Sequence, residues 1–577
     1  MSPILSDLDV VVVGSGAGGM IAALRAHDRG LRVAVFEKSQ YYGGTSAVSG
    51  GQFWVPNNHH MKKQDSPELA ADYIRTVTRG EVDEDRLTAF LRESPLMARY
   101  LEEIGMILEP VDWHPDYTPE AEGGIGGRSL VPANLDAAVL GDEIDLLRQP
   151  LALWKIFNRY SMDTSELGLF ALRLPGWKRT LVRLAWRYWS DIGWRRKRRR
   201  DRRLTMGGAL IGGLRRAMLE RDIPLYLNCR LASLTRGDDE ATSAEFERNG
   251  QRLFVTALRG VILAAGGFEH SQRLRDQYHQ VPTRVSASLT PGDNDGGAME
   301  AAQALGADVE FMQHAWWTPT SQLPLADLPN KVGAHATFRS PHSICVNGEG
   351  RRFADEACSY DRFGLAMIED HQRTGKSIPC WMVFDSQFRQ KYACGGLMPT
   401  AIMPDRMIPR DWWDTYIYRA DTIAALAEKM NVDVPTLVDE VARSNAFAAS
   451  GEDRDFGRGD TDYDRILSGD PRIQPSPCLA PIDRPPFYAI RLDLGDIGTK
   501  GGLKVDANAR VLDEKQSIIP GLYATGNIAG ALFASAYPGP GATLGTAMTF
   551  GFVAANAIAD AQYSPRNAQP LMAPNLQ

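Results

Sequence analysis

Residues 8–38 read LDVVVVGSGAGGMIAALRAHDRGLRVAVFEK, and this stretch decides the fold. Val10–Val13 is a run of β-branched residues, which predicts a buried parallel strand. A helix over Met20–Arg29 and a second strand over Leu31–Phe36 are expected after it. Between the first strand and the helix stand the three glycines of a GxGxxG motif, Gly14, Gly16 and Gly19. This order is typical of a dinucleotide-binding βαβ unit.

Each glycine of the motif has a separate role in such a unit. One forms the tight turn, one lets the backbone approach a pyrophosphate, and one lets the helix pack against the strand. The helix N-terminus offers free N–H groups and a positive dipole end to the phosphates. Glu37 stands 18 residues after Gly19, where an acidic side chain can accept a hydrogen bond from a ribose hydroxyl. We therefore expect Glu37 and the adjacent Lys38 to bind the cofactor.

Size and composition indicate a globular protein of more than one domain. The chain has 577 residues, of which 44% are hydrophobic and 23% charged, and this is enough for a large core. Its net charge of −7 argues against a nucleic-acid partner. Six scattered cysteines without a CxxC pair predict reduced thiols in a cytoplasmic protein rather than disulfides or a zinc site.

A signal peptide, a membrane span and a metal site are not expected. Residues 1–8 run directly into the first strand and leave no room for a signal peptide. No uncharged apolar run reaches the length of about 18 residues that a spanning helix needs. His59 and His60 are the only adjacent histidines. Because neighbouring side chains are expected to point apart, a surface loop is predicted there rather than a metal site.

Further glycine-rich stretches favour FAD over NAD as the cofactor. Residues 41–56, YYGGTSAVSGGQFWVP, are the kind of loop that large flavoproteins place along the pyrophosphate and against the isoalloxazine ring. A strand and loop, IPGLYATGN at 519–527, lead to a helix over Gly541–Ala559, whose N-terminus can donate to the flavin. No histidine lies in 41–56, so non-covalent FAD is expected. The further candidate cofactor residues are Gly44, Thr45, Ser46, Gly50, Gly51, Ala265, Gly266, Asp295, Gly526, Asn527, Gly541 and Leu544.

The pattern along the chain predicts an α/β protein with a two-part FAD-binding Rossmann-like domain. Residues 1–316 and 487–577 are assigned to this domain. Between them, prolines, aromatic residues and irregular runs replace the βαβ pattern. We expect residues 317–486 to form an inserted α+β catalytic cap domain.

A basic, tryptophan-rich segment, residues 146–203, interrupts the first part of the cofactor domain. It contains five tryptophans, and residues 177–203 carry twelve Lys or Arg residues against two Asp residues. In helical register one apolar face is formed by Trp177, Leu181, Leu184, Tyr188 and Ile192. Cationic residues with interfacial tryptophans are typical of a helix that lies in a membrane surface. A solvated basic face and a nucleic-acid patch are the alternatives, and no nucleic-acid recognition fold accompanies the segment.

Residues 536–551, AYPGPGATLGTAMTFG, are more specific than the GxGxxG motif. Together with GGTSAVSGGQFWVP at 43–56 and GLYATGN at 521–527, they resemble the 3-ketosteroid Δ1-dehydrogenases. These enzymes belong to the succinate dehydrogenase/fumarate reductase flavoprotein group. The resemblance covers nearly the whole chain except residues 146–203. It implies FAD-dependent removal of two hydrogens from C1 and C2 of a 3-ketosteroid A ring.

The resemblance also implies a catalytic role for each residue of the site. The Tyr537 hydroxyl and the backbone N–H of Gly541 would hold the C3 carbonyl oxygen as an oxyanion hole, which makes the C2 proton acidic. The family uses a tyrosine as the base for that proton, and Tyr360 is our candidate, with Tyr392 as its rival. Tyr117 resembles the tyrosine that hydrogen-bonds the base and relays its proton. The C1 hydride would go to flavin N5.

Several alternatives remain open on the same scaffold. A 3-ketosteroid Δ4-(5α)-dehydrogenase or a fumarate-reductase-like ene reductase would use similar motifs, and a membrane-bound flavoprotein that senses a lipid without turnover is the alternative of another class. Residues 146–203 depart from the compact family pattern. We expect them to attach the enzyme peripherally to the inner face of the cell membrane, because steroids partition into bilayers. An external electron acceptor such as a quinone is expected to complete the cycle.

Overall fold

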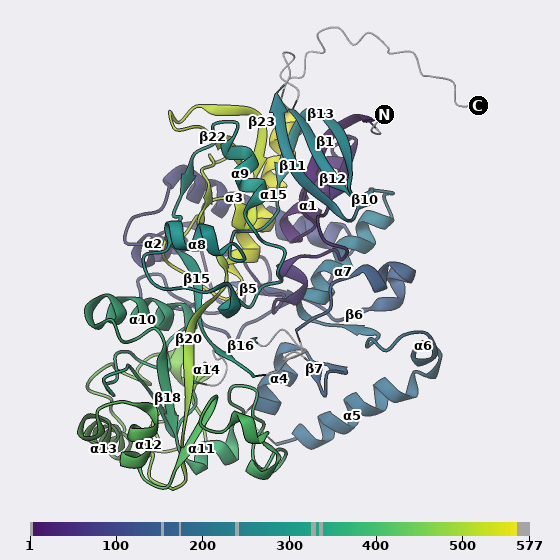
Figure 1. The fold of residues 1–577 in the computed structure, drawn as a ribbon. Coiled ribbons are helices and arrows are strands. Elements are labelled where there is room, and N and C mark those ends of the chain that lie inside the picture. The colour runs from purple at the N-terminus through teal and green to yellow at the C-terminus, as the bar shows by residue number, and fades with distance from the viewer. Residues whose placement is uncertain are drawn as a thin grey trace.

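The computed structural model describes residues 4–151, 155–171, 175–236, 242–324, 331–333 and 338–561. Figure 1 shows an upper part, which contains the first sheet and the C-terminal helix, and a lower part with a second sheet and its own helices. The long strand β20 (Phe487–Thr499) runs between the two parts. Trp154, one of the five tryptophans of the basic segment, lies outside the described residues.

The first sheet has the parallel centre that the βαβ pattern predicts, which confirms the α/β class. Its parallel strands are, in spatial order, β10 (Leu225–Tyr226), β2 (Val33–Phe36), β1 (Ile4–Val13), β13 (Gln251–Leu263) and β23 (Ile518–Ala524). Antiparallel partners extend it, namely β12 (Thr242–Arg248), β11 (Cys229–Arg236) and β22 (Arg510–Leu512). The run Val10–Val13 is buried on both faces of this sheet, as a central parallel strand must be.

Helix α1 (Ala17–Asp28) follows β1, and the C-terminal helix α15 (Ala542–Asp560) packs against it. Glycines allow the close approach. A Cβ on Gly18 would lie 2.8 Å from the carbonyl oxygen of Ala547, and one on Gly551 would lie 2.3 Å from that of Gly18. The first and last segments of the chain therefore build one layer together, over the same face of the sheet.

Helix α15 is the one helix of the described residues with the length and composition to cross a membrane. It packs against α1 and α3 (Glu84–Glu103), and 72% of its most apolar window is buried inside the protein. Its apolar composition therefore matches a place in the core.

Gly14 forms the tight turn between β1 and α1. Its φ is +105°, and a Cβ there would lie 2.3 Å from the carbonyl oxygen of Ala264. Gly14→Ala is expected to lower the melting temperature and to yield protein with little bound flavin, because the turn must open. The cost should exceed the about 1–2 kcal/mol of a left-handed backbone alone. Gly30→Ala is the matched control, since Gly30 also has a positive φ (+80°) but open space around it. Thermal unfolding and flavin absorbance measure both variants, and equal losses in the two would contradict the prediction.

The second sheet forms the core of the lower part. Its strands are β16 (Lys331–Gly333), β15 (Ala315–Gln322), β20, β18 (Cys380–Phe384) and β17 (Ser343–Val346), and β19 (Ile417–Ala420) also pairs with β20. Its helices are α10 (Tyr360–Thr374), α11 (Ser386–Lys391), α12 (Ile423–Met430), α13 (Val434–Ser450) and α14 (Asp462–Leu467). The sequence predicts the return to the cofactor domain at Phe487, but β20 pairs within the second sheet. The chain leaves this sheet only after Thr499, because β20 is long enough to bridge the two parts.

Smaller elements surround the space between the two sheets. The stretch 67–105 forms two helices, α2 (Pro67–Val77) and α3. The other helices of the upper part are α7 (Met206–Leu219), α8 (Gln272–Tyr278) and α9 (Gly297–Gln303). Short strands make a three-stranded sheet of β3 (Phe53–Trp54), β5 (Ser129–Pro132) and β4 (Leu108–Pro110), and a pair of β14 (Val309–Glu310) and β21 (Gly502–Leu503).

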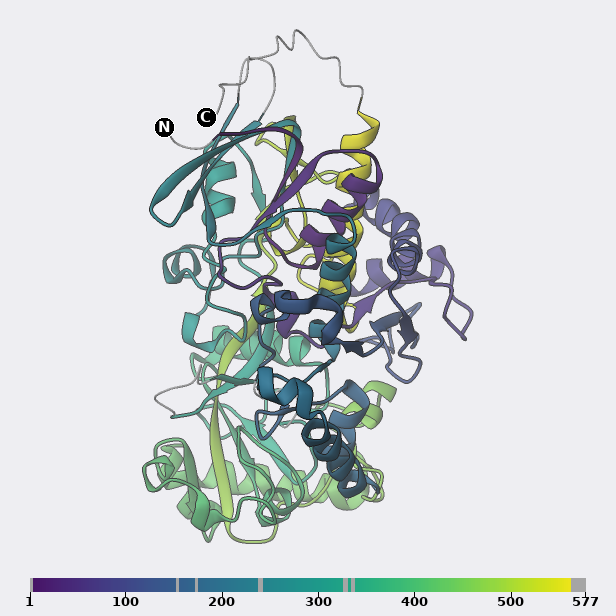
Figure 2. The ribbon, with the colours of Figure 1, turned by 90° about the vertical axis from the view of Figure 1, so that its right-hand side faces the viewer.

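The basic segment forms an arm that is closed at its base by β6 (Leu135–Asp136) and β9 (Arg203–Leu204). The arm contains β7 (Lys155–Ile156), β8 (Tyr160–Ser161), α4 (Thr164–Ala171), α5 (Trp177–Ser190) and α6 (Ile192–Lys197). Figure 2 shows the arm in front of the lower part, with α5 on the outside. It has a small core of its own, made of Tyr160, Met162, Leu184 and Tyr188.

Three residues of the predicted apolar face, Leu181, Leu184 and Tyr188, share one side of α5 as expected, but this side packs against the arm's own core. Leu184 and Tyr188 point into the small core of the arm and are buried. The exposed apolar stripe is instead Val182, Trp186 and Trp189, which are 68%, 71% and 55% exposed. Helix α5 is apolar on two sides, and the arm's own core covers the side that the helical register singled out.

Many of the positive charges of the arm are neutralised by ion pairs. Their carboxylate partners come from residues 136–166 as well as from Asp191 and Asp201. The pairs are Arg183–Glu166, Arg187–Asp201, Arg198 with Asp142 and Asp145, Arg202 with Asp136 and Asp191, and Arg203 with Asp163 and Glu166. The arm is therefore less basic at its surface than its composition indicates.

Candidate active site

One large cavity joins the upper and lower parts of the molecule. Its volume is about 1520 Å³. It begins at the GxGxxG turn, passes the loops 44–52 and 292–297, and ends among four tyrosines, Tyr117, Tyr360, Tyr463 and Tyr537. A dinucleotide and a second ligand placed in this space would therefore meet.

The turn after β2 presents an acidic side chain to the cavity. The Glu37 carboxylate accepts from the backbone N–H groups of Ser15 and Ser39, each at 2.9 Å, and from the Ser15 hydroxyl at 2.5 Å. These donors fix the carboxylate where it lines the cavity, as a ribose acceptor requires. Next to it, Lys38 Nζ lies 2.9 Å from the carboxylate of Asp295.

The structure brings the predicted cofactor residues together on one wall. All of them line the cavity except Gly19. A Cβ on Gly19 would lie 2.2 Å from the carbonyl oxygen of Gly14, so this glycine serves the packing of α1 on the turn. Gly51, at φ +70°, would bring a Cβ within 2.3 Å of the backbone of Met206. Two helix N-termini, an acidic acceptor and a wall of glycines fit FAD.

Three tyrosines from distant parts of the sequence meet at the other end of the cavity. Tyr117 comes from the loop between β4 and β5, Tyr360 is the first residue of α10, and Tyr537 precedes α15. The hydroxyl oxygens of Tyr117 and Tyr360 lie 3.2 Å apart, and Tyr360 is also hydrogen-bonded to Tyr537. Their ring centroids are 4.9 to 5.9 Å apart. The arrangement can pass a proton between neighbouring phenols.

Burial dominates the electrostatics of this cluster. Burial and the neighbouring phenols raise the pKa of Tyr360 well above the ordinary tyrosine value. Burial likewise raises the pKa of Tyr117 and of Tyr537, while hydrogen bonds from Tyr360, Thr543 and the Gly541 backbone act against the rise at Tyr537. Protonated phenols are therefore the resting state, which suits Tyr537 as a hydrogen-bond donor. A tyrosine that acts as a base here needs stabilisation of its anion.

The corner that carries Tyr537 is fixed by bonds from several elements. Tyr73 in α2 donates from its hydroxyl to the Pro538 carbonyl at 2.6 Å, and the Ser129 hydroxyl donates to the Pro540 carbonyl at 2.7 Å. The Trp54 backbone N–H donates to the Gly541 carbonyl at 3.1 Å. Gly541 has a φ of +88°, and its N–H donates to the Tyr537 oxygen. The Tyr537 hydroxyl and the Gly541 N–H thus lie together at one end of the cavity.

Tyr392 lies elsewhere. It is buried in the core of the lower part, and its hydroxyl donates to the Asp470 carboxylate at 2.6 Å. It is not among the cavity-lining residues, whereas Tyr360 is. The geometry therefore favours Tyr360 over Tyr392 as the base.

Sequence reasoning missed several residues at this end of the cavity. Tyr463 packs edge-on against Tyr117, with 5.4 Å between ring centroids, and Arg339 Nη1 donates to its hydroxyl at 2.8 Å. Trp316 packs 4.7 Å from Tyr537, and Lys500 Nζ lies 4.7 Å from the Trp316 ring centroid. Arg339 and Lys500 come from irregular segments, Trp316 from a strand and Tyr463 from the short helix α14, and no spacing in the sequence signals a site at these positions.

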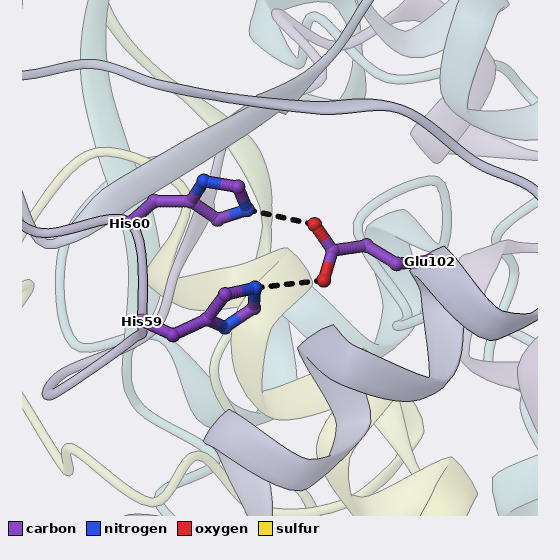
Figure 3. A group of neighbouring side chains, drawn as sticks. All are labelled: His59, His60 and Glu102. Atoms are coloured by element: carbon purple, nitrogen blue, oxygen red, sulfur yellow. Dashed lines mark hydrogen bonds and ion pairs between the residues drawn. The ribbon is translucent and has the colours of Figure 1, made fainter.

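The prediction that His59 and His60 point apart was wrong. Both rings face Glu102 of α3, as Figure 3 shows, and their centroids lie 4.2 Å apart. Each Nε2 atom is 2.7 Å from a different oxygen of that carboxylate. The loop after β3 has no regular strand geometry there, so alternation of side chains does not apply.

Comparison with known proteins agrees with the geometry. The FAD binding domain family model matches residues 9–544. The chain is 38% identical over 579 residues to a 3-oxosteroid 1-dehydrogenase of Mycobacterium tuberculosis, covering 96% of this chain and 99% of that protein. It is 33% identical to a 4-oxocyclohexanecarboxylate 2-dehydrogenase of Sinomonas cyclohexanicum, covering 96% and 93%.

A crystal structure of 3-ketosteroid Δ1-dehydrogenase from Sterolibacterium denitrificans in complex with 1,4-androstadiene-3,17-dione superposes with a TM-score of 0.92. It shares 45% identity and covers 96% of this chain and 99% of that one. The predicted fold class and the FAD cofactor are thereby confirmed. The chain belongs to the FAD-binding flavoproteins and, among them, to the family of the 3-oxosteroid 1-dehydrogenases.

Proposed function

We propose that this protein desaturates 3-ketosteroids between C1 and C2. The C2 proton passes to Tyr360, the C1 hydrogen leaves with its electron pair, and the C1=C2 double bond forms from the remaining electrons. FAD, when bound, supplies the two-electron acceptor for the hydride at N5. The observation that carries this proposal is the meeting of Tyr117, Tyr360 and Tyr537 at the end of the cavity that the cofactor residues line.

The roles of the chain's own residues follow from their geometry. The Tyr537 hydroxyl and the Gly541 N–H would donate to the C3 carbonyl oxygen and stabilise the negative charge that develops there when C2 loses its proton. Tyr117 would donate to the Tyr360 oxygen, 3.2 Å away, and relay its proton. The predicted division into residues 1–316 and 487–577 for FAD and 317–486 for the cap is part of the same proposal, except that β20 pairs in the sheet of the cap.

Two rival enzyme activities use the same scaffold. A fumarate-reductase-like ene reductase needs cationic clamps for carboxylates, whereas the corner at 536–541 offers a phenol and a backbone N–H. A Δ4-(5α)-dehydrogenase differs only in which carbons of the ring lose hydrogen. The high identity to 3-oxosteroid 1-dehydrogenases over the whole chain supports C1–C2.

One anaerobic experiment tests the activity. Purified holoenzyme is mixed with 4-androstene-3,17-dione, and the flavin absorbance should bleach as the 1,4-diene forms. A saturated 3-ketosteroid should give the 1-ene and no 4-ene. Bleaching with a 4-ene product would favour the Δ4-(5α) activity. Binding without bleaching would favour the lipid-sensing flavoprotein and contradict our proposal.

The pH dependence of the reaction follows from the raised pKa of Tyr360. Only the deprotonated phenol accepts the C2 proton, and its pKa lies above the ordinary value of about 10. The deprotonated fraction therefore rises about tenfold per pH unit below that pKa. We expect kcat/KM to rise with pH through the alkaline range in which the protein stays folded, as circular dichroism would verify. A kcat/KM that is flat from neutral pH upward would contradict the prediction.

We further propose that the arm, residues 146–203, rests on the inner face of the cell membrane. The stripe Val182, Trp186 and Trp189 presents apolar area to solvent, with two indoles suited to the interface. The arm lines the cavity through Leu151 and through Leu167 of α4, which gives a steroid a route from the bilayer to the site. The six free, buried cysteines support a reducing compartment. A membrane quinone as the electron acceptor belongs to the same proposal.

The exposed stripe provides the test of membrane binding. The double variant Trp186→Asp/Trp189→Asp is expected to lose sedimentation with vesicles of anionic phospholipid, because two interfacial anchors become charges. Turnover of a soluble steroid should stay within about twofold, since neither residue lines the cavity. Met407→Asp is the matched control, because Met407 is 59% exposed and lies on the lower part, outside residues 146–203. Unchanged sedimentation of the double variant would contradict the proposal.

A further inference from the structure

His59, His60 and Glu102 form a compact group of donor atoms on the upper part. The two histidines lie in the loop after β3, and Glu102 lies in the last turn of α3. Figure 3 shows both rings directed at the carboxylate. The distances from the two Nε2 atoms to the two oxygens are both 2.7 Å, and all ligand atoms lie within 4.8 Å of one another.

We propose that this group binds a divalent d-block cation, with Zn²⁺ as the type. Two imidazole nitrogens and one carboxylate oxygen are ligands that Zn²⁺ takes, with water as the fourth. With metal–ligand distances of about 2.0–2.2 Å, tetrahedral ligand atoms are roughly 3.3 Å apart. Small side-chain movements from the present separations would make room for the ion.

The charges around the group favour a cation. Glu102 forms no ion pair with Lys or Arg among the described residues, and its ionic contacts there are those with the two histidines. Both histidines can ligate as neutral imidazoles if the ring proton resides on Nδ1, so the chain need not lose a proton. The three side chains are 24–30% exposed, which leaves solvent access for the ion and for a water ligand.

The loop is held in place before any ion binds. The His60 backbone N–H donates to the Asn58 amide oxygen at 3.1 Å, and Asn58 Nδ2 donates to the Val55 carbonyl at 2.8 Å. An ion that bridges this loop to α3 would also fix the neighbouring Trp54. The Trp54 backbone N–H donates to the Gly541 carbonyl. The ion is therefore expected to stabilise the fold rather than to take part in catalysis.

Cobalt provides a visible probe of this site. Chelator-treated holoenzyme without a histidine tag is titrated with Co²⁺, and one equivalent should bind with tetrahedral visible bands. Glu102→Gln and His59→Asn/His60→Asn should each weaken binding at least about tenfold. Zn²⁺ should raise the melting temperature of the wild type alone among these three.

His27→Asn is the matched control, because His27 is another exposed histidine beside a carboxylate. It should bind Co²⁺ as the wild type does. Equal melting temperatures in chelator would show that the variants are folded. Equal Co²⁺ affinity of Glu102→Gln and the wild type, a thiolate spectrum, or no bound metal would overturn the proposal.

Arg339 lines the catalytic end of the cavity. Its side chain is buried and forms no ion pair with a carboxylate among the described residues, and its Nε has no hydrogen-bond partner there. Its Nη1 donates to the Tyr463 hydroxyl at 2.8 Å, and Tyr463 packs edge-on against Tyr117. Its own carbonyl accepts from Arg458 Nη2 at 3.0 Å, which anchors the backbone.

We infer that Arg339 is a positioning residue that places a positive charge beside the Tyr117–Tyr360 pair through Tyr463. This inference rests on the proposed function. A buried cation without a carboxylate partner favours anions nearby. In keeping with this, Arg339 acts against the rise that burial imposes on the pKa of Tyr117 and of Tyr463. The same charge would stabilise the tyrosinate that removes the C2 proton.

The other charged groups near the pair do not replace Arg339. Lys500 is bonded to Asp361, and burial lowers the pKa of His114 to about 4, so this imidazole is neutral. Arg362, two residues after Tyr360, is paired with Glu120. The remaining titratable groups that act on Tyr117 or Tyr463 are phenols, a thiol and an acid, namely Tyr360, Tyr537, Cys358 and Asp464. Within the described residues, Arg339 is thus the cation that faces Tyr463 and Tyr117 without a carboxylate partner.

The test compares pH profiles of kcat/KM. Arg339→Gln should move the alkaline rise about one pH unit higher, which lowers kcat/KM about tenfold at neutral pH. KM and bound flavin should stay the same, and Arg339→Lys should restore most of the rate. A higher KM with an unmoved profile would assign Arg339 to substrate binding and overturn the inference. If the flavin of the wild-type enzyme did not bleach with a 3-ketosteroid, the proposed function itself would be contradicted.

Discussion

Tyr360→Phe is expected to lower kcat by about 10²–10⁴-fold, the usual loss when a general base is removed. The substitution deletes one oxygen that lies 3.2 Å from the Tyr117 hydroxyl and is hydrogen-bonded to Tyr537. The ring stays, so packing against Tyr117 and Tyr537 is retained. Steroid binding and bound flavin should therefore change little, and the loss should appear in the rate of flavin reduction under anaerobic single-turnover conditions.

Tyr392→Phe is the matched control for this loss. It also removes a buried phenolic oxygen from the lower part, but one that is bonded to Asp470 and lies outside the cavity. It should cost stability, about 1–3 kcal/mol for a partner left unsatisfied, and leave the rate of reduction unchanged. If the rate of flavin reduction fell in Tyr392→Phe and stayed unchanged in Tyr360→Phe, Tyr392 and not Tyr360 would be the base.

The cofactor half of the site could be predicted from sequence because its residues act through backbone geometry. Gly14, Gly19 and Gly51 are needed where a Cβ would collide or φ is positive, and this need is visible as glycine in the sequence. Glu37 follows a strand at a fixed distance from the motif. Local rules thus place these residues before any tertiary contact is known.

The catalytic half follows from long-range contacts that local rules do not contain. Tyr117 and Tyr360 are 243 residues apart in sequence and meet only because α10 and the loop before β5 face one cavity. The sequence alone offered Tyr392 equally well as a buried tyrosine, and only the family pattern ranked Tyr360 first. Arg339 and Tyr463 carry no sequence pattern, since they are brought together only by a long-range hydrogen bond between an irregular segment and the short helix α14.

The arm shows a different limit of sequence reasoning. The sequence shows that the arm is basic and rich in tryptophan, and its periodicity predicts an apolar face on α5. Which side of α5 is exposed depends on the residues of the arm that pack against the helix. Leu184 and Tyr188 are covered by Tyr160 and Met162, which leaves Trp186 on the outside. Helical periodicity finds an apolar stripe, and it does not distinguish a core-facing stripe from an exposed one when a helix carries both.

Tyr537→Phe is expected to cost about 10²–10³-fold in kcat, because it removes one of the two donors to the developing oxyanion. The Gly541 N–H would remain, since it belongs to a backbone that Trp54 and the N-terminal turn of α15 hold in place. Partial rather than complete loss is therefore expected. The melting temperature and the bound flavin should stay close to those of the wild type. A lower rate in a folded, flavin-loaded variant would then reflect the lost phenol and not a general loss of structure.

The kinetic isotope effect gives the sharper test of this role. Without the Tyr537 donor, loss of the C2 proton becomes more difficult, so substrate deuterated at C2 should show a larger isotope effect in Tyr537→Phe than in the wild type. Substrate deuterated at C1 reports on hydride loss instead, and its effect should not increase. The reverse pattern would mean that Tyr537 assists the hydride step, and the oxyanion hole would then have to be placed elsewhere in the cavity.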